Sequence, residues 1–242
     1  MNENLDLFEK VINKTIPKVD YVDIRGGNGN NTSIIMKDGE VQEINTGNSL
    51  GIRIRVLNNG AWGFAYTNDL SKLDEIAQTS IKISNSLKGD ESLSKADIIQ
   101  DKVSTDVKIP FSDVSIEEKK EIMSEASKAA SLKEVTSTTV SYSDSQSQEV
   151  ILSSEGTSIE MNTNRVAMFL NAAASDGTMM QLGHNSIGGV KGFEAISDED
   201  IEAFGRKIGE KAVRLLKAES APSGRFPIIA DPNLTGVFVH EA

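Results

Sequence analysis

The sequence contains a His–Glu pair whose residue types suit metal-dependent hydrolysis. His240 is followed directly by Glu241. On a helix, a histidine in such a pair can bind a metal ion, and the glutamate can act as general base toward the metal-bound water. The pair therefore makes His240 a candidate metal ligand and Glu241 a candidate catalytic base.

A His–Glu pair is a weak signal by itself, because it also occurs by chance and a surface histidine is the simpler interpretation. His184 is the only other histidine, and the chain has no cysteine. A catalytic zinc site usually takes roughly three protein ligands. These residues cannot supply them without several carboxylates. His184 follows Gly183 in a polar region, where we expect a solvated loop residue rather than a ligand.

A helix start precedes the pair. Asp231 suits the N-cap position and Pro232 the first helical position, where its missing N–H has no cost. His240 would then lie about two turns inside this helix.

The residues around the pair resemble the TldD/PmbA family, once called modulators of DNA gyrase. Its protease-type members have a Pro-x-Gly linker, an apolar strand and the pattern Gly-x-x-x-His-Glu-Ala, and the present chain has the matching segments 221–232 and 236–242. Further matching segments occur upstream in the expected order, at 21–25, 38–41, 51–56, 60–68 and 188–194.

The resemblance implies a cytoplasmic metal-dependent peptidase that hydrolyses unfolded or small peptides. It implies zinc as the metal, His240 as a ligand and Glu241 as the base. It also implies pairing with a homologous, non-catalytic PmbA-type subunit or with a second copy. The His–Glu pair favours the catalytic type of subunit, because partner-type members lack it.

The family pattern continues beyond what these residues contain. The motif His-Glu-x-x-x-His, a later ligand and a large C-terminal domain are absent from the 242 residues. We therefore expect an N-terminal portion that is truncated within the motif and inactive as it stands. The alternative is a non-catalytic binding or assembly module whose strand edges capture extended peptides or a partner.

Composition narrows the class of protein. The formal net charge is −11 and the pI is about 4.8, which argues against a general nucleic-acid surface. The lack of cysteine fits a reducing compartment. No signal peptide is recognised, and no run approaches the roughly 20 apolar residues that span a bilayer. We expect a cytoplasmic protein that binds neither membranes nor nucleic acid.

Hydrophobic periodicity predicts an α+β fold. Two antiparallel strand-rich meanders with flanking helices are expected at 1–88 and 115–220. A polar connecting segment at 89–114 joins them, and 221–242 would hold a linker, a strand and the start of the metal-motif helix. A turn is expected at Gly26-Gly27-Asn28-Gly29, and Trp62, Phe64 and Tyr66 are expected on a buried strand face.

The two strand-rich stretches resemble one another. A shift of 117 positions places Asp38-Gly39 on Glu155-Gly156 and Gly60 on Gly177. The shared register suggests an internal duplication, and shared turn chemistry in two unrelated meanders is the alternative.

Overall fold

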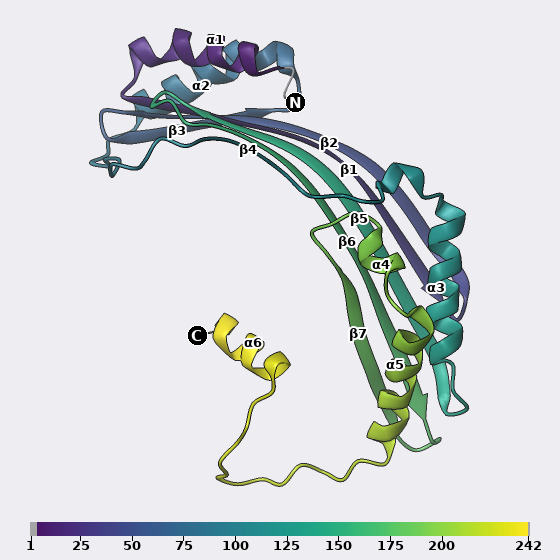
Figure 1. Ribbon diagram of the computed structural model, residues 1–242. Coiled ribbons are helices and arrows are strands. Elements are labelled where there is room, and N and C mark those ends of the chain that lie inside the picture. Colours follow the sequence, from purple (N-terminus) through teal and green to yellow (C-terminus); the bar gives the residue numbers. More distant parts are fainter. Residues whose placement is uncertain (1–3, 242) are drawn as a thin grey trace.

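The computed structural model describes residues 4–241 and has the predicted α+β architecture (Figure 1). The strands are β1 (Tyr21–Lys37), β2 (Glu40–Asn58), β3 (Ala61–Thr67), β4 (Gln100–Ser104), β5 (Val135–Ser153), β6 (Ser158–Ser175) and β7 (Met180–Gly189). The α-helices are α1 (Leu5–Thr15), α2 (Leu73–Ser86), α3 (Ile116–Ala130), α4 (Glu194–Ser197), α5 (Ile201–Leu216) and α6 (Pro232–Glu241).

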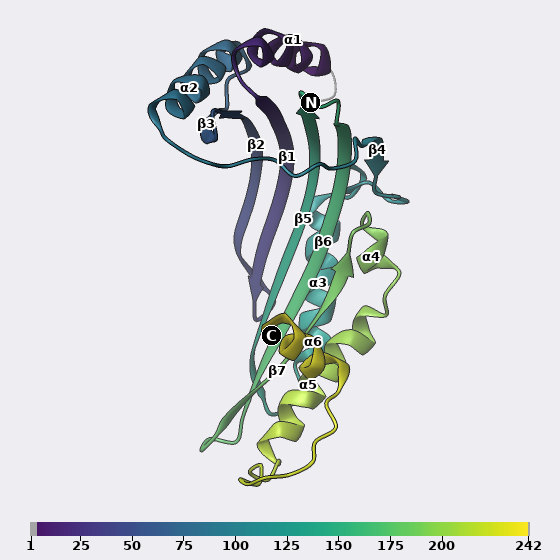
Figure 2. The same cartoon turned by 90° about the vertical axis from the view of Figure 1, so that its left-hand side faces the viewer.

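The strands form one curved sheet. Within the described residues it has seven strands, in the order β3-β2-β1-β5-β6-β4, with β7 paired to another part of β6. Neighbouring strands are antiparallel, except that β4 runs parallel to β6. The long strands bend into an arch, which is seen from two sides in Figures 1 and 2.

The two halves repeat one topology, as the shift of 117 positions predicts. Each consists of a helix, three antiparallel strands and a later helix: α1-β1-β2-β3-α2 and α3-β5-β6-β7-α5, with the short α4 before α5. The matched turn glycines all have positive φ, which favours glycine. These φ angles are 82° for Gly39, 101° for Gly156, 73° for Gly60 and 91° for Gly177.

β1 and β5 join the halves at the centre of the sheet. Gly29 pairs with Ser147, and Asn30 pairs with Gln146. Under the shift, Gly29 is the counterpart of Gln146 and Asn30 is the counterpart of Ser147. This register therefore relates the halves by a local twofold axis between the two pairs.

The hydrophobic core lies on one face of the sheet. Val22 and Ile24 of β1 belong to a buried cluster with α1 and α2, whereas Ile34 and Met36 belong to a second cluster with α3 and α5. All four positions are even-numbered, and side chains alternate between the faces of a strand. Both helical pairs therefore cover the same face, called the outer face here. The other face, inside the arch, is called the inner face.

The predicted turn at Gly26–Gly29 is wrong. These residues continue β1, paired with β2 on one side and β5 on the other. Two complete ladders satisfy their backbone hydrogen bonds, so the local preference of glycine for turns does not decide the conformation. The same tertiary pairing makes β2 a single strand from Glu40 to Asn58.

The segment predicted as a connection, 89–114, runs along the sheet. It contributes β4 at the edge, where Gln100 to Ser104 pair with Ser158 to Asn162. Both halves share one sheet, and β1 and β5 each contribute side chains to both clusters. The boundaries at 88, 114 and 220 stay a prediction.

Glu194 fastens the connecting segment to the start of α4. Its carboxylate accepts hydrogen bonds from the backbone N–H groups of Ile109 at 3.0 Å, Lys108 at 3.3 Å and Gly192 at 3.1 Å. Burial alone would raise the pKa of Glu194, but the backbone hydrogen bonds together outweigh it and lower the pKa to about 2.

Because the pKa of Glu194 falls from its ordinary value of 4.5 on folding, its contribution to stability is fully present above about pH 4.5 and is lost as the pH falls toward 2. We expect Glu194→Gln to lower the free energy of unfolding at pH 7 by about 1–3 kcal/mol. It should also flatten the pH dependence of that free energy below pH 4.5. Urea unfolding over a pH series measures both effects, with exposed Glu199→Gln as control; equal behaviour of the two variants would contradict the assignment.

Candidate functional site

His240 and Glu241 lie in the last turn of α6. Asp231 caps this helix as predicted: its Oδ1 accepts a hydrogen bond from the N–H of Leu234 at 2.8 Å, and its carbonyl accepts one from the N–H of Thr235 at 2.9 Å. The cap and Pro232 explain where the helix begins. The sequence therefore predicted the local structure that carries the pair.

α6 and the segment before it do not pack on the rest of the described chain. No residue of α6 is buried. Residues 218–231 form no strand, although one was expected within 221–242, and no neighbouring strand accepts their backbone hydrogen bonds. The large apolar side chains here are all exposed: Phe226, Ile228, Ile229, Leu234, Val237, Phe238 and Val239. Packing against the described fold therefore does not fix the position of the His–Glu pair.

The described residues do not complete a metal site. No group of three or more His, Cys, Asp or Glu side chains among residues 4–241 is placed to hold a metal ion. His184 lies in β7 rather than in the expected loop, because residues 180–189 pair with β6. It is exposed, and its backbone carbonyl accepts a hydrogen bond from Lys211. The chain thus contributes one ligand candidate and one base candidate, fewer than the roughly three ligands of a catalytic zinc.

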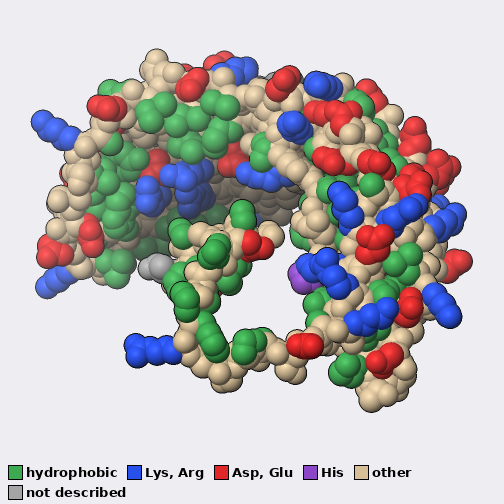
Figure 3. Space-filling model, turned by 60° about the horizontal axis from the view of Figure 1, so that its bottom comes forward, with side chains coloured by type: hydrophobic (Ala, Val, Ile, Leu, Met, Phe, Trp, Pro, Cys, Tyr) green, Lys and Arg blue, Asp and Glu red, His purple; other side chains and the backbone are tan. Residues whose placement is uncertain are grey.

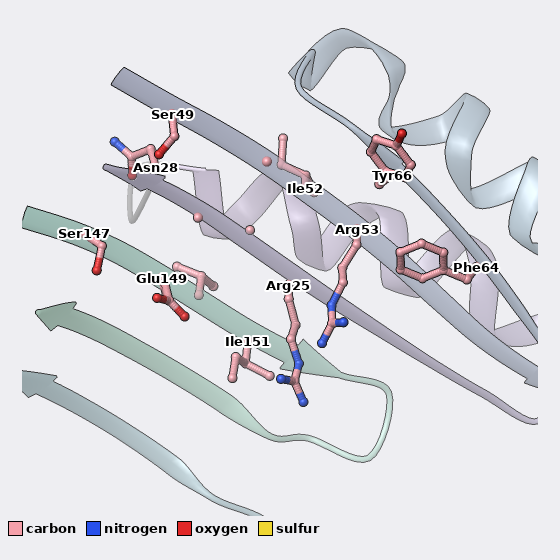
Figure 4. A pocket seen from close by; sticks show the side chains of 14 residues that line it. Arg25, Asn28, Ser49, Ile52, Arg53, Phe64, Tyr66, Ser147, Glu149 and Ile151 are labelled. Atoms are coloured by element: carbon pink, nitrogen blue, oxygen red, sulfur yellow. The ribbon is translucent and has the colours of Figure 1, made fainter. Parts of the chain in front are cut away.

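A second candidate site, not predicted from the sequence, is a hollow of about 520 Å³ on the inner face. Arg25 of β1 and Arg53 of β2 lie directly opposite one another there. Figure 4 shows both arginine side chains extending in the same direction from neighbouring strands, with Glu149 of β5 across the hollow and Phe64 and Tyr66 of β3 to one side.

The aromatic residues of β3 are on the opposite face from the one expected. Phe64 is 45% exposed and Tyr66 is 77% exposed. α2 packs so closely on the other face of β3 that a Cβ on Gly63 would lie 1.8 Å from the Ser80 carbonyl oxygen. Only small side chains fit under α2, so the aromatic residues point into the arch.

Two residues further along β2, the charge of a third arginine, Arg55, is neutralised. Arg55 donates to Asp23 through Nε at 2.8 Å, and its second guanidinium nitrogen lies 2.7 Å from the same oxygen. The Arg55 guanidinium also lies 4.3 Å from the centre of the Trp62 ring. Asp23 is buried, so this pair belongs to the folded framework of the inner face.

A sequence signal for the arginine cluster exists in the alternation Ile52-Arg53-Ile54-Arg55 and in Ile24-Arg25. Strict alternation places the isoleucines on the outer face and the arginines on the inner face. What the sequence does not show is the pairing of β1 with β2 that sets Arg25 opposite Arg53.

Two family models match the chain. Residues 22–84 match domain 1 of the PmbA/TldA metallopeptidases, and residues 109–216 match the central domain of the same metallopeptidases.

Curated relatives agree with these models. A metalloprotease of Methanothermobacter thermautotrophicus is 50% identical over 242 residues, which are 100% of this chain and 53% of that protein. A metalloprotease of Methanocaldococcus jannaschii is 37% identical over 245 residues, covering 99% of this chain and 53% of the relative. The chain thus spans about half the length of the curated relatives it matches.

Solved structures share the fold. A protein of Bacteroides thetaiotaomicron described as a modulator of DNA gyrase superposes with a TM-score of 0.79 at 17% identity, over 93% of this chain and 52% of that chain. TldE from Thermococcus kodakarensis gives a TM-score of 0.63 at 16% identity, over 86% of this chain and 47% of its own. At these identities the likeness concerns the fold.

Among residues 4–241, no helix combines the length and apolar character needed to cross a membrane.

Proposed function

The chain belongs to the TldD/PmbA metallopeptidase family, and on this basis we propose that it forms the N-terminal half of a metal-dependent peptidase acting on unfolded or small peptides. In this proposal His240 is a metal ligand and Glu241 is the general base. The remaining ligands belong to the part of the protein that corresponds to the other half of its relatives.

The observation that carries the proposal is the His240-Glu241 pair on a capped helix in a chain of this family. When bound, a zinc ion would polarise the scissile carbonyl and acidify a water molecule. Glu241 would accept the proton of that water, and its place next to a ligand in the sequence keeps it close to the reacting groups. His240 would bind through a neutral imidazole nitrogen.

The exposed apolar residues between Phe226 and Val239 support the proposal that this chain contacts a further part of the same protein. A group of large exposed apolar side chains normally marks a contact with another part of a protein. We propose that the part of the protein corresponding to the rest of its relatives covers this segment and thereby fixes α6. Pairing with a PmbA-type subunit or with a second copy, and location in the cytoplasm, belong to the same proposal and rest on the family resemblance.

Zinc titration tests whether the metal ligands come partly from this chain and partly from the rest of the whole protein. The 242-residue chain should bind zinc weakly, because His240 and one adjacent carboxylate leave the sphere incomplete. A fused protein, in which this chain is joined to the part of the Methanothermobacter relative outside the match, should bind zinc tightly and hydrolyse an unfolded peptide. Calorimetry and peptide turnover on both proteins provide the comparison. Tight, stoichiometric binding by the 242-residue chain that is lost in His240→Ala would contradict the shared sphere.

A further inference from the structure

Arg25 and Arg53 form an unneutralised pair of positive charges. They are directly opposite on antiparallel strands, an arrangement in which like charges destabilise a sheet. Among the described residues neither has an ion pair, whereas Arg55 in the next row is held by Asp23. The chain as a whole carries a net charge of −11, so it has more acidic than basic side chains, yet none of them forms an ion pair with Arg25 or Arg53 among the described residues.

The space beside the arginine pair is open. The next row of the ladder pairs Gly27 with Gly51, and a Cβ built on Gly51 would meet no atom within 4 Å. The floor at Gly51 is backbone, whereas a Cβ built on Gly27 would lie 3.4 Å from Cγ of Glu149. A ligand can therefore approach the guanidinium groups from the Gly51 side without displacing a side chain. Figure 3 shows Lys and Arg side chains gathered inside the arch.

The walls of the hollow combine an apolar side with a single acidic group. Phe64 and Tyr66 lie with their ring centres 6.3 Å apart, and Ile151 lines the same hollow. Glu149 is the one carboxylate among the lining residues, so two arginines and one glutamate leave a formal charge of +1. A charge of +1 beside aromatic rings matches a monoanionic carboxylate next to an apolar side chain.

We propose that this hollow binds the carboxylate of an extended peptide, with Arg25 and Arg53 donating to its oxygens and Phe64 and Tyr66 contacting the neighbouring side chain. Guanidinium groups bind carboxylates through paired N–H donors, so a two-arginine site suits that group. The hollow's volume lies in the range of small-ligand sites. The proposal rests on the proposed peptidase function and assigns a site for one end of the substrate class.

Fluorescence anisotropy on the 242-residue chain tests the site without any catalysis. The probe is a labelled pentapeptide ending in Phe with a free carboxylate, and its C-terminally amidated form is the comparison. We expect the amidated peptide to bind at least about tenfold more weakly, the factor expected for loss of a charge-assisted contact. A terminal carboxylate and an acidic side chain offer the same chemistry. An amidated peptide with a penultimate Asp distinguishes them: retained affinity identifies the side chain as the source, and lost affinity identifies the chain end.

Matched variants locate the binding. Arg25→Gln and Arg53→Gln should each weaken binding of the free-carboxylate peptide about tenfold. Glu149→Gln should tighten binding, because it removes the negative charge in the hollow, and Arg214→Gln on exposed α5 should leave it unchanged. The melting temperature of Arg25→Gln should not fall, since the change removes a like-charge contact.

Equal affinity for the free and amidated peptides would overturn the proposal, as would an Arg214→Gln effect as large as that of Arg25→Gln. Absence of binding by both peptides would overturn it too, while hydrolysis by the fused protein would still support the peptidase function. Binding here combined with a fused protein that holds metal and hydrolyses no peptide would refute the peptidase function and leave the carboxylate site in place.

Discussion

Glu241→Gln in the fused protein is expected to keep the metal and to lower peptide hydrolysis by about 10²–10⁴-fold, the usual contribution of a general base. Glutamine has nearly the same shape as glutamate but cannot accept the proton of an attacking water. Since Glu241 is proposed as a base rather than a ligand, the metal content should not change.

Metal content and turnover should be measured on the same samples of the wild-type and variant fused proteins. Glu219→Gln, a change in an exposed residue outside α6, is the matched control and should behave as wild type. A metal-replete Glu241→Gln protein with full activity would show that the base lies elsewhere.

Lys119→Met is expected to destabilise the fold by about 3–5 kcal/mol, the cost of removing one partner of a buried ion pair. Lys119 of α3 lies 2.7 Å from Asp144 of β5, and both side chains are almost fully buried. The hydroxyl group of Tyr142 donates to the same carboxylate oxygen at 2.7 Å. Burial and, second, this hydrogen bond raise the pKa of Tyr142, so the phenol stays protonated. Without Lys119, Asp144 keeps this donor but loses its counter-charge.

Urea unfolding measures the loss, and two further variants define its cause. Lys120→Met removes a lysine that is 36% exposed and should change stability by less than about 0.5 kcal/mol. The double variant Lys119→Met/Asp144→Leu should recover part of the loss, because no unpaired charge remains, although the Tyr142 hydroxyl loses its acceptor. A single Lys119→Met variant as stable as Lys120→Met would show that the pair contributes nothing.

Local features of the fold were predictable from the sequence where short-range chemistry decides them. The Asp231 cap was predicted at the right place. The shift of 117 positions matched Gly39 with Gly156 and Gly60 with Gly177, and all four have positive φ, because such conformations depend on a few adjacent residues. The repeated topology agrees with the internal duplication that this match suggested, whereas the twofold relation is seen only in the pairing of β1 with β5.

Features that depend on partners far away in the sequence were not predictable in this way. The glycines between Gly26 and Gly29 remain extended because two neighbouring strands hold them. The aromatic residues of β3 face the arch because α2 occupies the other side of the strand. Arg25 and Arg53 become a site only through the pairing of β1 with β2. The His–Glu pair was visible in the sequence, yet packing within the described fold does not fix its surroundings.

The role of His240 as a ligand is the central claim, and metal analysis of the purified fused protein tests it most directly. The fused protein should contain about one metal ion per chain, as expected for a site with a single catalytic zinc. Its His240→Ala variant should lose both the metal and peptide hydrolysis, whereas His184→Ala should retain both. A His240→Ala protein that keeps its full metal content and activity would contradict the account.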